Sequence, residues 1–554
     1  MLPNTAKPMM PATKDWQALG AEKRAANLHK IPTPWRLPES ITKAIDQSST
    51  ISVLDVPKSC GLLSQDELDI TEKYDATGLL EQLASGGLQS QDVTRAFCKR
   101  AAIAHQVTNC LTEIFFDHAM QRAEVLDDYF AREKKPMGPL HGLPISLKES
   151  YNVKGIPNTT GYISFLDKPP AANNGAIIEV LLSLGAVLYV KTNVPQTFMT
   201  GDSENNVFGR TLNPHRLCVT AGGSTGGEGA LIALRGSILG VGTDSAGSIR
   251  IPSLCNGLSG FKPTANRIPF GGNTAPGRLG SPSPILPVTG PLGTSIRDLE
   301  LFMKVVIDSD PWVFDEAVIA VPWRSVPRPP LTTRLRIGLI TEDPSLPLHP
   351  PTLRALRTAV QKLENNGHTI VPLDGAIPSL WSSAVLAWRF FLLDPSKAVL
   401  RNIQAGNEPV IKSVQLTRFP ENEGWEPTMD NLFDLMVQRR SIMRTYHDLL
   451  IQNRLDAVLM PPNQCPAPLH DTYGVTPYTV LANFLDWPAA VVPFGKADKE
   501  KDALFLRKEI KYVPEYNADL AEGLPCSLQL MGRPMKDEEL VRHLEIVAKV
   551  LDED

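Results

Sequence analysis

Apolar positions along the chain recur at two spacings, one typical of helices and the other of short buried strands. Between residues 351 and 366, leucine and valine side chains recur three or four positions apart, which predicts a helix that Gly367 ends. Short apolar runs at 336–341 and 368–373 flank this helix and predict strands. The unit therefore predicts a strand–helix–strand arrangement.

A second unit of this kind lies between residues 174 and 191. Asn174 is a residue type that caps helix N-termini, and apolar residues follow at helical spacing from 177 to 184. Gly185 fits the position just beyond the helix end, where glycine adopts the left-handed conformation. The apolar run 186–191 then predicts a strand.

A long helix predicted at 429–454 leads into a strand at 457–460. The alternation of helices and strands favours an α/β fold: a single large domain with a central mixed β-sheet covered by helices on both faces. One amphipathic helix, predicted at 15–28, precedes this pattern. We therefore expect an N-terminal helical extension at 1–74 and the main domain at 75–554.

Composition and charge narrow the class of protein. The chain has 554 residues and a net charge of −5, so it lacks the basic surface of a nucleic-acid-binding protein. No apolar run reaches the roughly 18 residues needed to span a bilayer, and Met1–Ala12 lacks the apolar core of a signal peptide. We expect a cytoplasmic protein without nucleic-acid or membrane partners, for which a homodimer is compatible with the sequence.

Cysteine and histidine give no sign of a metal. The seven cysteines form no CxxC pair, and the ten histidines show no HxxxH or HExxH spacing. We therefore expect neither a metal ion nor another cofactor. Cys255 is interpreted as a small core residue.

One window of the chain is unusually rich in glycine. Residues 222–260 hold 11 glycines and six serines, and glycine at that density indicates backbone with positive φ or close approach to a ligand. The window contains Gly222-Gly-Ser-Thr-Gly-Gly around Ser224, and Gly242-Thr-Asp-Ser-Ala-Gly-Ser around Ser248. Upstream, Gly142-Leu-Pro-Ile-Ser-Leu precedes Lys148.

These three segments resemble the amidase-signature family. They occur in the family's order, with 76 residues from Lys148 to Ser224 and 24 from Ser224 to Ser248. The resemblance covers roughly residues 75–545, with the catalytic core at 140–265, and the N-terminal text is most similar to fungal acetamidase-type members. It implies an amidase that cleaves carboxylic amides to the acid and ammonia or an amine, through an acyl-serine intermediate.

The resemblance also implies a role for each site residue. Ser248 would be the nucleophile, Lys148 the base and Ser224 the proton relay between them. The backbone amides of Ser245, Ala246, Gly247 and Ser248 would form the oxyanion hole, and Phe198 and Met199 would line the acyl pocket. Thr225 and Ala246 replace a serine and a glycine of the family pattern. A threonine keeps the hydroxyl, and an alanine is tolerated where φ is not positive.

A lysine can serve as this base only if its pKa is lowered. At the reference pKa near 10.4, about one lysine in 2,500 is neutral at pH 7. Burial beside the apolar residues Leu143, Ile145 and Leu147 would lower the pKa of Lys148 and supply a usable base. Asp244 and Arg250 are expected to pair and brace the glycine-rich segment.

Other interpretations of the same residues stay open. Gly222-Gly-Ser224-Thr-Gly226 also fits a nucleophile elbow, with Asp456 and His470 as partners in an esterase-like triad. Ser259 and Lys262 match an SxxK motif. An amidotransferase catalytic subunit or an inactive binding protein could share the scaffold. Trp381, Trp388, Phe390 and Phe391 are interpreted as core more than as pocket.

Overall fold

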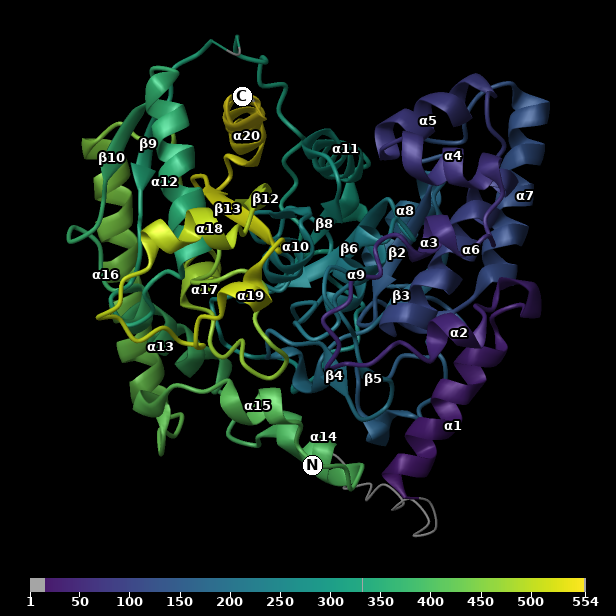
Figure 1. The fold of residues 1–554 in the computed structure, drawn as a ribbon, viewed down its shortest axis with the longest axis horizontal. Helices are drawn as coiled ribbons and strands as arrows, with labels where there is room; N and C mark the ends of the chain where they lie inside the picture. The colour runs from purple at the N-terminus through teal and green to yellow at the C-terminus, as the bar shows by residue number, and fades with distance from the viewer. Residues whose placement is uncertain (1–14, 331, 553–554) are drawn as a thin grey trace.

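An eleven-stranded mixed sheet runs through the centre of the molecule and is covered by helices, as the sequence pattern predicts (Figure 1). The computed structural model describes residues 15–330 and 332–552. The strand order is β1 (Leu111–Ile114), β3 (Val187–Thr192), β2 (Pro144–Lys148), β6 (Leu239–Asp244), β8 (Val288–Gly293), β7 (Ser259–Lys262), β12 (Ala489–Lys496), β13 (Pro525–Met531), β11 (Ala457–Met460), β9 (Arg336–Leu339) and β10 (Thr369–Pro372).

The sheet has two parallel groups of three strands, joined by antiparallel strands through its centre, and the outermost strand β1 pairs antiparallel with β3. Strands β3, β2 and β6 run parallel to one another, as do β11, β9 and β10, while the strands from β6 through β8, β7, β12, β13 and β11 pair antiparallel. A separate two-stranded hairpin joins β4 (Glu204–Asn205) and β5 (Gly209–Arg210). The parallel pair β2 and β6 carries the chemistry described below.

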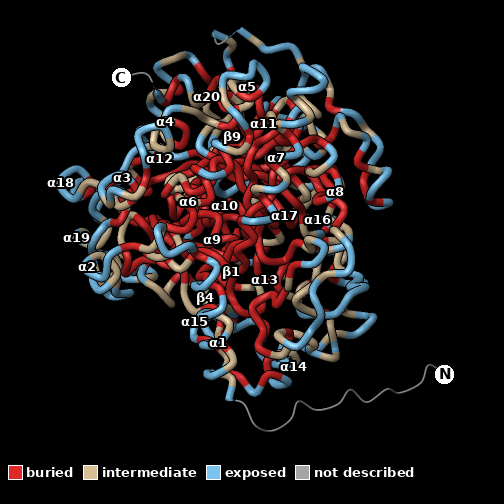
Figure 2. The backbone as a smooth tube through the Cα atoms, turned by 90° about the vertical axis from the view of Figure 1, so that its right-hand side faces the viewer, coloured by how far each residue is buried: buried red, intermediate tan, exposed pale blue. Residues whose placement is uncertain are grey.

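Helices from both halves of the chain pack against this sheet. The N-terminal helices lie to the right in Figure 1 and the helices after residue 330 mostly to the left, while buried backbone fills the middle of the molecule (Figure 2). The helices are α1 (Trp16–His29), α2 (Glu39–Thr42), α3 (Val56–Ser59), α4 (Gln65–Lys73), α5 (Ala76–Ser85), α6 (Ser90–Thr108), α7 (Phe116–Glu133), α8 (Ala176–Ser183), α9 (Gly226–Ala233), α10 (Arg250–Asn256), α11 (Ile296–Ile307), α12 (Pro350–Asn365), α13 (Leu380–Phe391), α14 (Ala398–Ala405), α15 (Lys412–Leu416), α16 (Met429–Gln452), α17 (Pro477–Leu485), α18 (Lys499–Asp502), α19 (Ala518–Ala521) and α20 (Asp537–Asp552).

The predicted elements agree with the structure to within a few residues. Strand β11 has the predicted bounds, α1 and α12 each begin and end within one residue of the prediction, and α16 ends two residues early. Gly185 and Gly367 follow helices α8 and α12 with φ of 92° and 82°, the left-handed conformation expected of them.

The prediction of Asn174 as a helix cap is wrong. The cap of α8 is Gly175, which has no side chain to accept a hydrogen bond from the first backbone amides of the helix. Asn174 instead accepts a hydrogen bond from the Lys154 amide at 2.7 Å and donates one to Glu179 at 2.9 Å. The Ala176 amide at the start of α8 bonds to the carbonyl of Gly271, so a distant loop supplies the acceptor that a cap side chain would have provided.

Helix α1 lies against β1, the strand at one end of the sheet. Asn27 is buried and donates to the carbonyl of Thr112 in β1. Lys23 and Lys30 both form ion pairs with Glu113, a fully buried carboxylate of the same strand. The first helix of the chain is therefore attached to the sheet through both main-chain and charged contacts.

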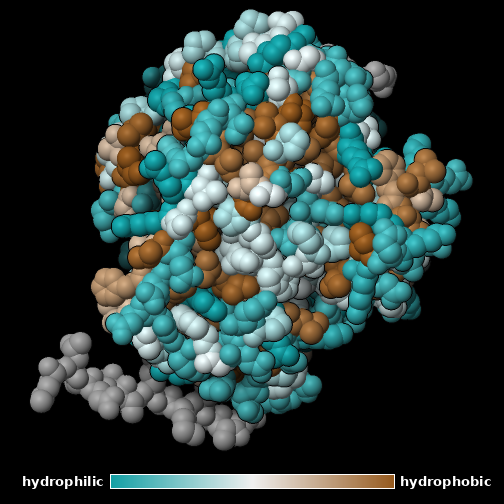
Figure 3. Space-filling model, turned by 90° about the vertical axis from the view of Figure 1, so that its left-hand side faces the viewer, coloured by the Kyte–Doolittle hydropathy of each residue, from teal (hydrophilic) through white to brown (hydrophobic). Residues whose placement is uncertain are grey.

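The surface on the α16 side mixes polar and apolar side chains (Figure 3). On α16 itself, Met429, Phe433 and Val437 are each about two-thirds exposed and lie four residues apart on one helix face. Across residues 15–330 and 332–552, no helix combines the length and apolar character required to cross a membrane. Met1–Ala12, expected to lack a signal peptide, lies outside the described residues.

Candidate active site

Two neighbouring parallel strands bring the first site residues together. Leu147 of β2 pairs with Val241 of β6, so the strands end at the same edge of the sheet. Lys148 is the last residue of β2, and Thr243 and Asp244 end β6. Residues 95 positions apart in sequence thus become neighbours because parallel strands present their carboxyl ends at one edge.

The Lys148 ammonium group is fully buried and has two close hydroxyl partners. Its Nζ lies 2.7 Å from Ser224 Oγ and 2.7 Å from Thr243 Oγ1, with the Thr243 carbonyl at 3.4 Å. The Phe198 ring centre is 5.1 Å away. Within the part of the chain that the structure describes, no carboxylate contacts Lys148, and the carboxyls of Asp244 and Glu228 act on it only from a distance.

Burial lowers the pKa of Lys148 to about 7, although the more distant carboxyls of Asp244 and Glu228 oppose the shift. Glu228 lies in the same interior. Burial raises the pKa of Glu228 to about 8, opposed by hydrogen bonds from Ser146 and Thr192. Near neutral pH the site therefore holds an amine that is easily deprotonated and a carboxyl that is easily protonated.

Ser224 stands in a tightly packed loop before helix α9. The Gly223–Ser224 peptide bond is cis. A Cβ on Gly223 would lie 2.4 Å from the carbonyl oxygen of Thr200, so this position has room only for glycine. Ser203 ties the two ends of the loop, because its hydroxyl donates to the Gly222 carbonyl at 2.9 Å and accepts from the Gly226 amide at 3.1 Å.

Asp244 and Arg250 form a fully buried ion pair across the segment that carries Ser248, with 3.0 Å between Arg250 Nη2 and Asp244 Oδ1. Asp244 also accepts the backbone amides of Gly247 at 2.8 Å and Ile249 at 3.1 Å. Burial would raise the pKa of Asp244, but Arg250 holds it at about 2. Arg250 reaches further, to the Thr479 carbonyl and Gln529, both at 2.7 Å. This pair anchors both sides of Ser248.

The expected set of oxyanion amides needs one correction. The Gly247 amide is already donated to Asp244 and is not free for a ligand. The amides of Ser245, Ala246 and Ser248 have no protein acceptor within the described parts of the chain. Gly247 itself has a φ of 126°, and a Cβ there would lie 2.2 Å from Thr479 Oγ1. Ala246 is not among the residues with positive φ, so its backbone suits an alanine.

Ser248 lies at a small pocket, which Gly223, the residue before Ser224, also lines. The expected residues Phe198 and Met199 line it, as do Ser245 and Ala246. Trp388 from α13 also lines the pocket, although the sequence favoured a core position. The residue belongs to both the main core and the pocket wall, and only 6% of it is exposed. The remaining lining residues are Thr200, Gly223, Ile251 and Thr476.

The esterase-like triad of Ser224, Asp456 and His470 is not assembled. The side-chain partner of Ser224 is Lys148. His470 Nε2 donates to the Leu217 carbonyl at 2.8 Å, and its Nδ1 lies 3.5 Å from Asp202. Asp456 is exposed and accepts the Arg336 amide at the start of β9. Each of the three residues therefore bonds to a different partner, and none of these bonds joins one of the three to another.

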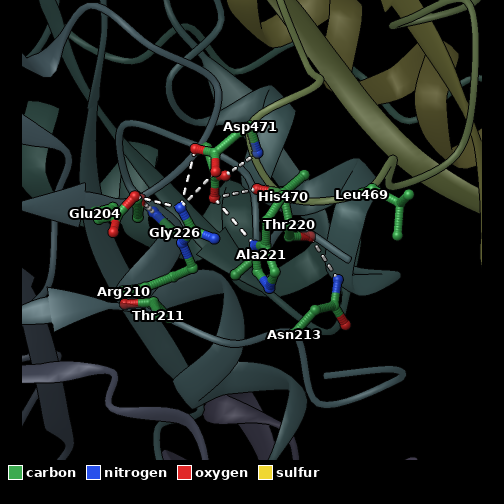
Figure 4. A network of polar contacts seen from close by, with 12 residues as sticks. Glu204, Arg210, Thr211, Asn213, Thr220, Ala221, Gly226, Leu469, His470 and Asp471 are labelled. Carbon is green, nitrogen blue, oxygen red and sulfur yellow. Dashed lines mark hydrogen bonds and ion pairs between the residues drawn. The ribbon is translucent and has the colours of Figure 1, made fainter. Parts of the chain in front are cut away.

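His470 belongs to a polar network beside the Ser224 loop (Figure 4). Arg210 bonds to both carboxylate oxygens of Asp471 at 2.9 Å and to Glu204. Asp202 accepts the Asp471 amide at 2.8 Å and the Thr220 hydroxyl at 2.8 Å. The network joins the loop around residue 470 to the segment leading into Gly222.

Three other residues from the sequence lie outside the pocket lining. Lys262 is buried, and its Nζ donates to the Pro263 carbonyl at 2.7 Å instead of to Ser259. Cys255 is a fully buried core residue, as interpreted from the sequence. The Thr225 hydroxyl is 3.4 Å from the Thr243 carbonyl.

Sequence reasoning missed two neighbours of Lys148. Thr243 supplies one of its two hydroxyl partners, and Glu228 supplies the nearby buried carboxyl. Both stand inside the glycine-rich window already singled out. A threonine directly before Asp244, and the one acidic residue among the glycines after Ser224, were the available signals.

Comparison with known proteins agrees with this geometry. The model of the Amidase family matches residues 92–541. An amidase of Gibberella moniliformis is 40% identical over 98% of this chain and 99% of its own, and an acetamidase of Emericella nidulans is 37% identical over 97% and 98%. The solved structure of a fatty acid amide hydrolase superposes with a TM-score of 0.90 at 34% identity, covering 98% of this chain and 96% of that one.

The fold and these relatives define an amide hydrolase. The chain belongs to the amidase family, with the amidase-signature fold.

Proposed function

We propose that this enzyme cleaves carboxylic amides through an acyl-serine intermediate on Ser248, with Lys148 as base and Ser224 as relay. The observation that carries the proposal is the fully buried Lys148 amine, 2.7 Å from Ser224 Oγ and with a pKa of about 7. A base with that pKa is half neutral at pH 7. Among residues 15–330 and 332–552, no carboxylate contacts Lys148 to hold its amine in the charged form.

In the first step the neutral Lys148 amine takes the proton of Ser224 Oγ, and Ser224 takes the proton of Ser248. Ser248 Oγ forms a bond to the amide carbonyl carbon, and the carbonyl π electrons move to oxygen. The free amides of Ser245, Ala246 and Ser248 are suited to hold that oxyanion; each such donor contributes about 3 kcal/mol to barrier lowering in comparable sites. The Asp244–Arg250 pair keeps these amides in place.

In the second step the proton returns along the same path to the leaving nitrogen. The C–N bond breaks, ammonia or an amine departs, and the acyl group stays on Ser248. Water then loses its proton to the relay and attacks the ester, releasing the acid and restoring Ser248. Every proton is returned, so the chain's own residues suffice and the proposal uses no cofactor.

The test is covalent trapping followed by mass spectrometry. An acylating fluorophosphonate should modify Ser248, and Ser248→Ala should lose both labelling and turnover while keeping its circular dichroism spectrum. Ser259→Ala is the matched control, because it removes a buried serine of the neighbouring strand and should leave both intact. An adduct on Ser224 instead would overturn the assignment and revive an esterase-like nucleophile.

We propose a small-molecule amide as the only required partner and the cytoplasm as the compartment. Labelling of the purified single chain separates this enzyme from an amidotransferase subunit that needs partners and from an inactive scaffold. Light scattering reads out whether the chain is a homodimer.

A further inference from the structure

The walls of the pocket beside Ser248 are largely apolar and come from three parts of the chain. Phe198 and Met199 follow β3, Ile251 belongs to α10, and Trp388 comes from α13. Hydrocarbon groups of an acyl chain match such walls, whereas a departing amine is polar and leaves toward water. The apolar side of this pocket therefore suits the acyl part of a substrate.

The pocket is small. Its cavity volume is about 20 Å³, and a cavity needs roughly 10–15 Å³ on the same scale to hold one water. The pocket at Ser248 therefore has room for one or two groups of the size of a water molecule. Ala246 is one of the residues that line this space.

Trp388 is the largest side chain in the wall, and its neighbours hold it in place. Its ring meets Phe391 at 5.5 Å and Phe419 at 5.1 Å, both edge to face. Its side chain is buried in the main core. Moving the indole to admit a longer substrate would break both ring contacts, each worth a measurable amount beyond simple burial.

We propose that Trp388 sets the upper size limit of the acyl group, so that the enzyme favours primary amides of two- and three-carbon acids. This inference rests on the proposed function, since it places the acyl group in the pocket at Ser248. It concerns this chain's own wall residue and cavity. Trp388 acts by excluding longer chains, and it takes no part in proton transfer.

The experiment is a chain-length series with acetamide, propionamide, butyramide and hexanamide, measured as kcat/KM. One methylene in a fitted pocket changes specificity by about 10- to 200-fold, so the wild type should prefer acetamide to butyramide by at least about tenfold. Trp388→Ala should shift that ratio toward butyramide and hexanamide by more than about tenfold. Trp388→Leu, a milder truncation, should shift the acetamide-to-butyramide ratio in the same direction. It keeps the test valid if Trp388→Ala does not fold.

Trp381→Ala is the matched control. Trp381 lies on the same helix and meets the same Phe419 ring at 5.0 Å, but it bonds to Glu421 and does not line the pocket. Its removal should leave the chain-length ratio unchanged. A ratio shifted equally by Trp381→Ala would show that loosening α13 matters and not the pocket wall, and would overturn the proposal.

Two further results would overturn it. One is a wild type that hydrolyses hexanamide as efficiently as acetamide. The other is a pair of folded Trp388 variants that keep the wild-type ratio, or that gain activity only toward amides of larger amines, such as acetanilide. Labelling rates with methyl- and octyl-substituted fluorophosphonates give the same comparison without turnover. Failure of the nucleophile assignment would appear separately, as activity retained in Ser248→Ala.

Discussion

Replacing Lys148 tests whether this amine acts as a base. The pKa of about 7 makes about half of Lys148 neutral at pH 7, against about one in 2,500 at the reference value. Burial has therefore raised the reactive fraction by about three orders of magnitude. If base strength and orientation are lost together, Lys148→Ala should reduce kcat/KM by at least that factor at pH 7.

The pH profile distinguishes a base from a structural residue. For the wild type, kcat/KM should rise about tenfold per pH unit below 7 and level off above it, because only the neutral amine accepts a proton. Lys148→Arg should not restore activity, since guanidinium stays protonated in this range. Glu228→Gln is the control: its pKa of about 8 lies close by, yet the ascending limb should survive in this variant.

Stability measurements test whether the Lys148 variants are folded. The folded-state pKa of about 7 lies below the unfolded value near 10.4. The charged form therefore costs stability below pH 7, and this cost is relieved as the pH rises toward 10.4. Lys148→Met should melt at or above the wild-type temperature at pH 6. A wild-type-like pH profile in Lys148→Arg, or loss of the ascending limb in Glu228→Gln alone, would refute the assignment of the base.

Three further predictions follow from the surrounding contacts. Asp244→Ala should lower the free energy of unfolding in urea by about 3–5 kcal/mol, because it leaves Arg250 buried without its partner. The folded pKa of Asp244 is depressed to about 2, so the stabilisation by this carboxylate is present above about pH 4 and is lost as the pH falls toward 2. An unchanged unfolding midpoint at pH 7 would contradict this prediction. Gly247→Ala should lower kcat more than about 100-fold, because the new Cβ meets Thr479, whereas Thr225→Ser should stay near wild type; equal activities in steady-state assays would count against the packing argument. His470→Ala should keep kcat/KM within about tenfold, and a loss beyond about 100-fold in a folded variant would bring histidine back into the chemistry.

Sequence patterns correctly predicted helix ends that depend only on the residues at the helix end itself. Gly185 and Gly367 follow their helices because glycine adopts positive φ without strain, and this holds in any surroundings. Asn174 fails for the opposite reason. The start of α8 takes its acceptor from Gly271, nearly one hundred residues away, and no local pattern contains that contact.

The candidate site divides in the same way. Family resemblance predicted Lys148, Ser224 and Ser248 as the site, and the structure brings Lys148 Nζ within 2.7 Å of Ser224 Oγ. The sequence could not show that the Gly247 amide donates a hydrogen bond to Asp244, because this bond depends on the rotamer of the Asp244 side chain. It also could not choose between core and pocket for Trp388. A buried indole fits both a core position and a pocket wall until its neighbours are known.

The contact between α1 and β1 has a consequence for the solubility of the chain. An outermost strand exposes unpaired amides and carbonyls that can template pairing with another molecule. Here Asn27 occupies the carbonyl of Thr112, and Lys23 and Lys30 cover Glu113 on that outermost strand. Helix α1 therefore reduces the chance that the edge strand β1 pairs with another molecule. A chain shortened to begin after residue 30 would retain every residue of the proposed triad, but it would leave the Thr112 carbonyl without Asn27 and Glu113 without these two cations.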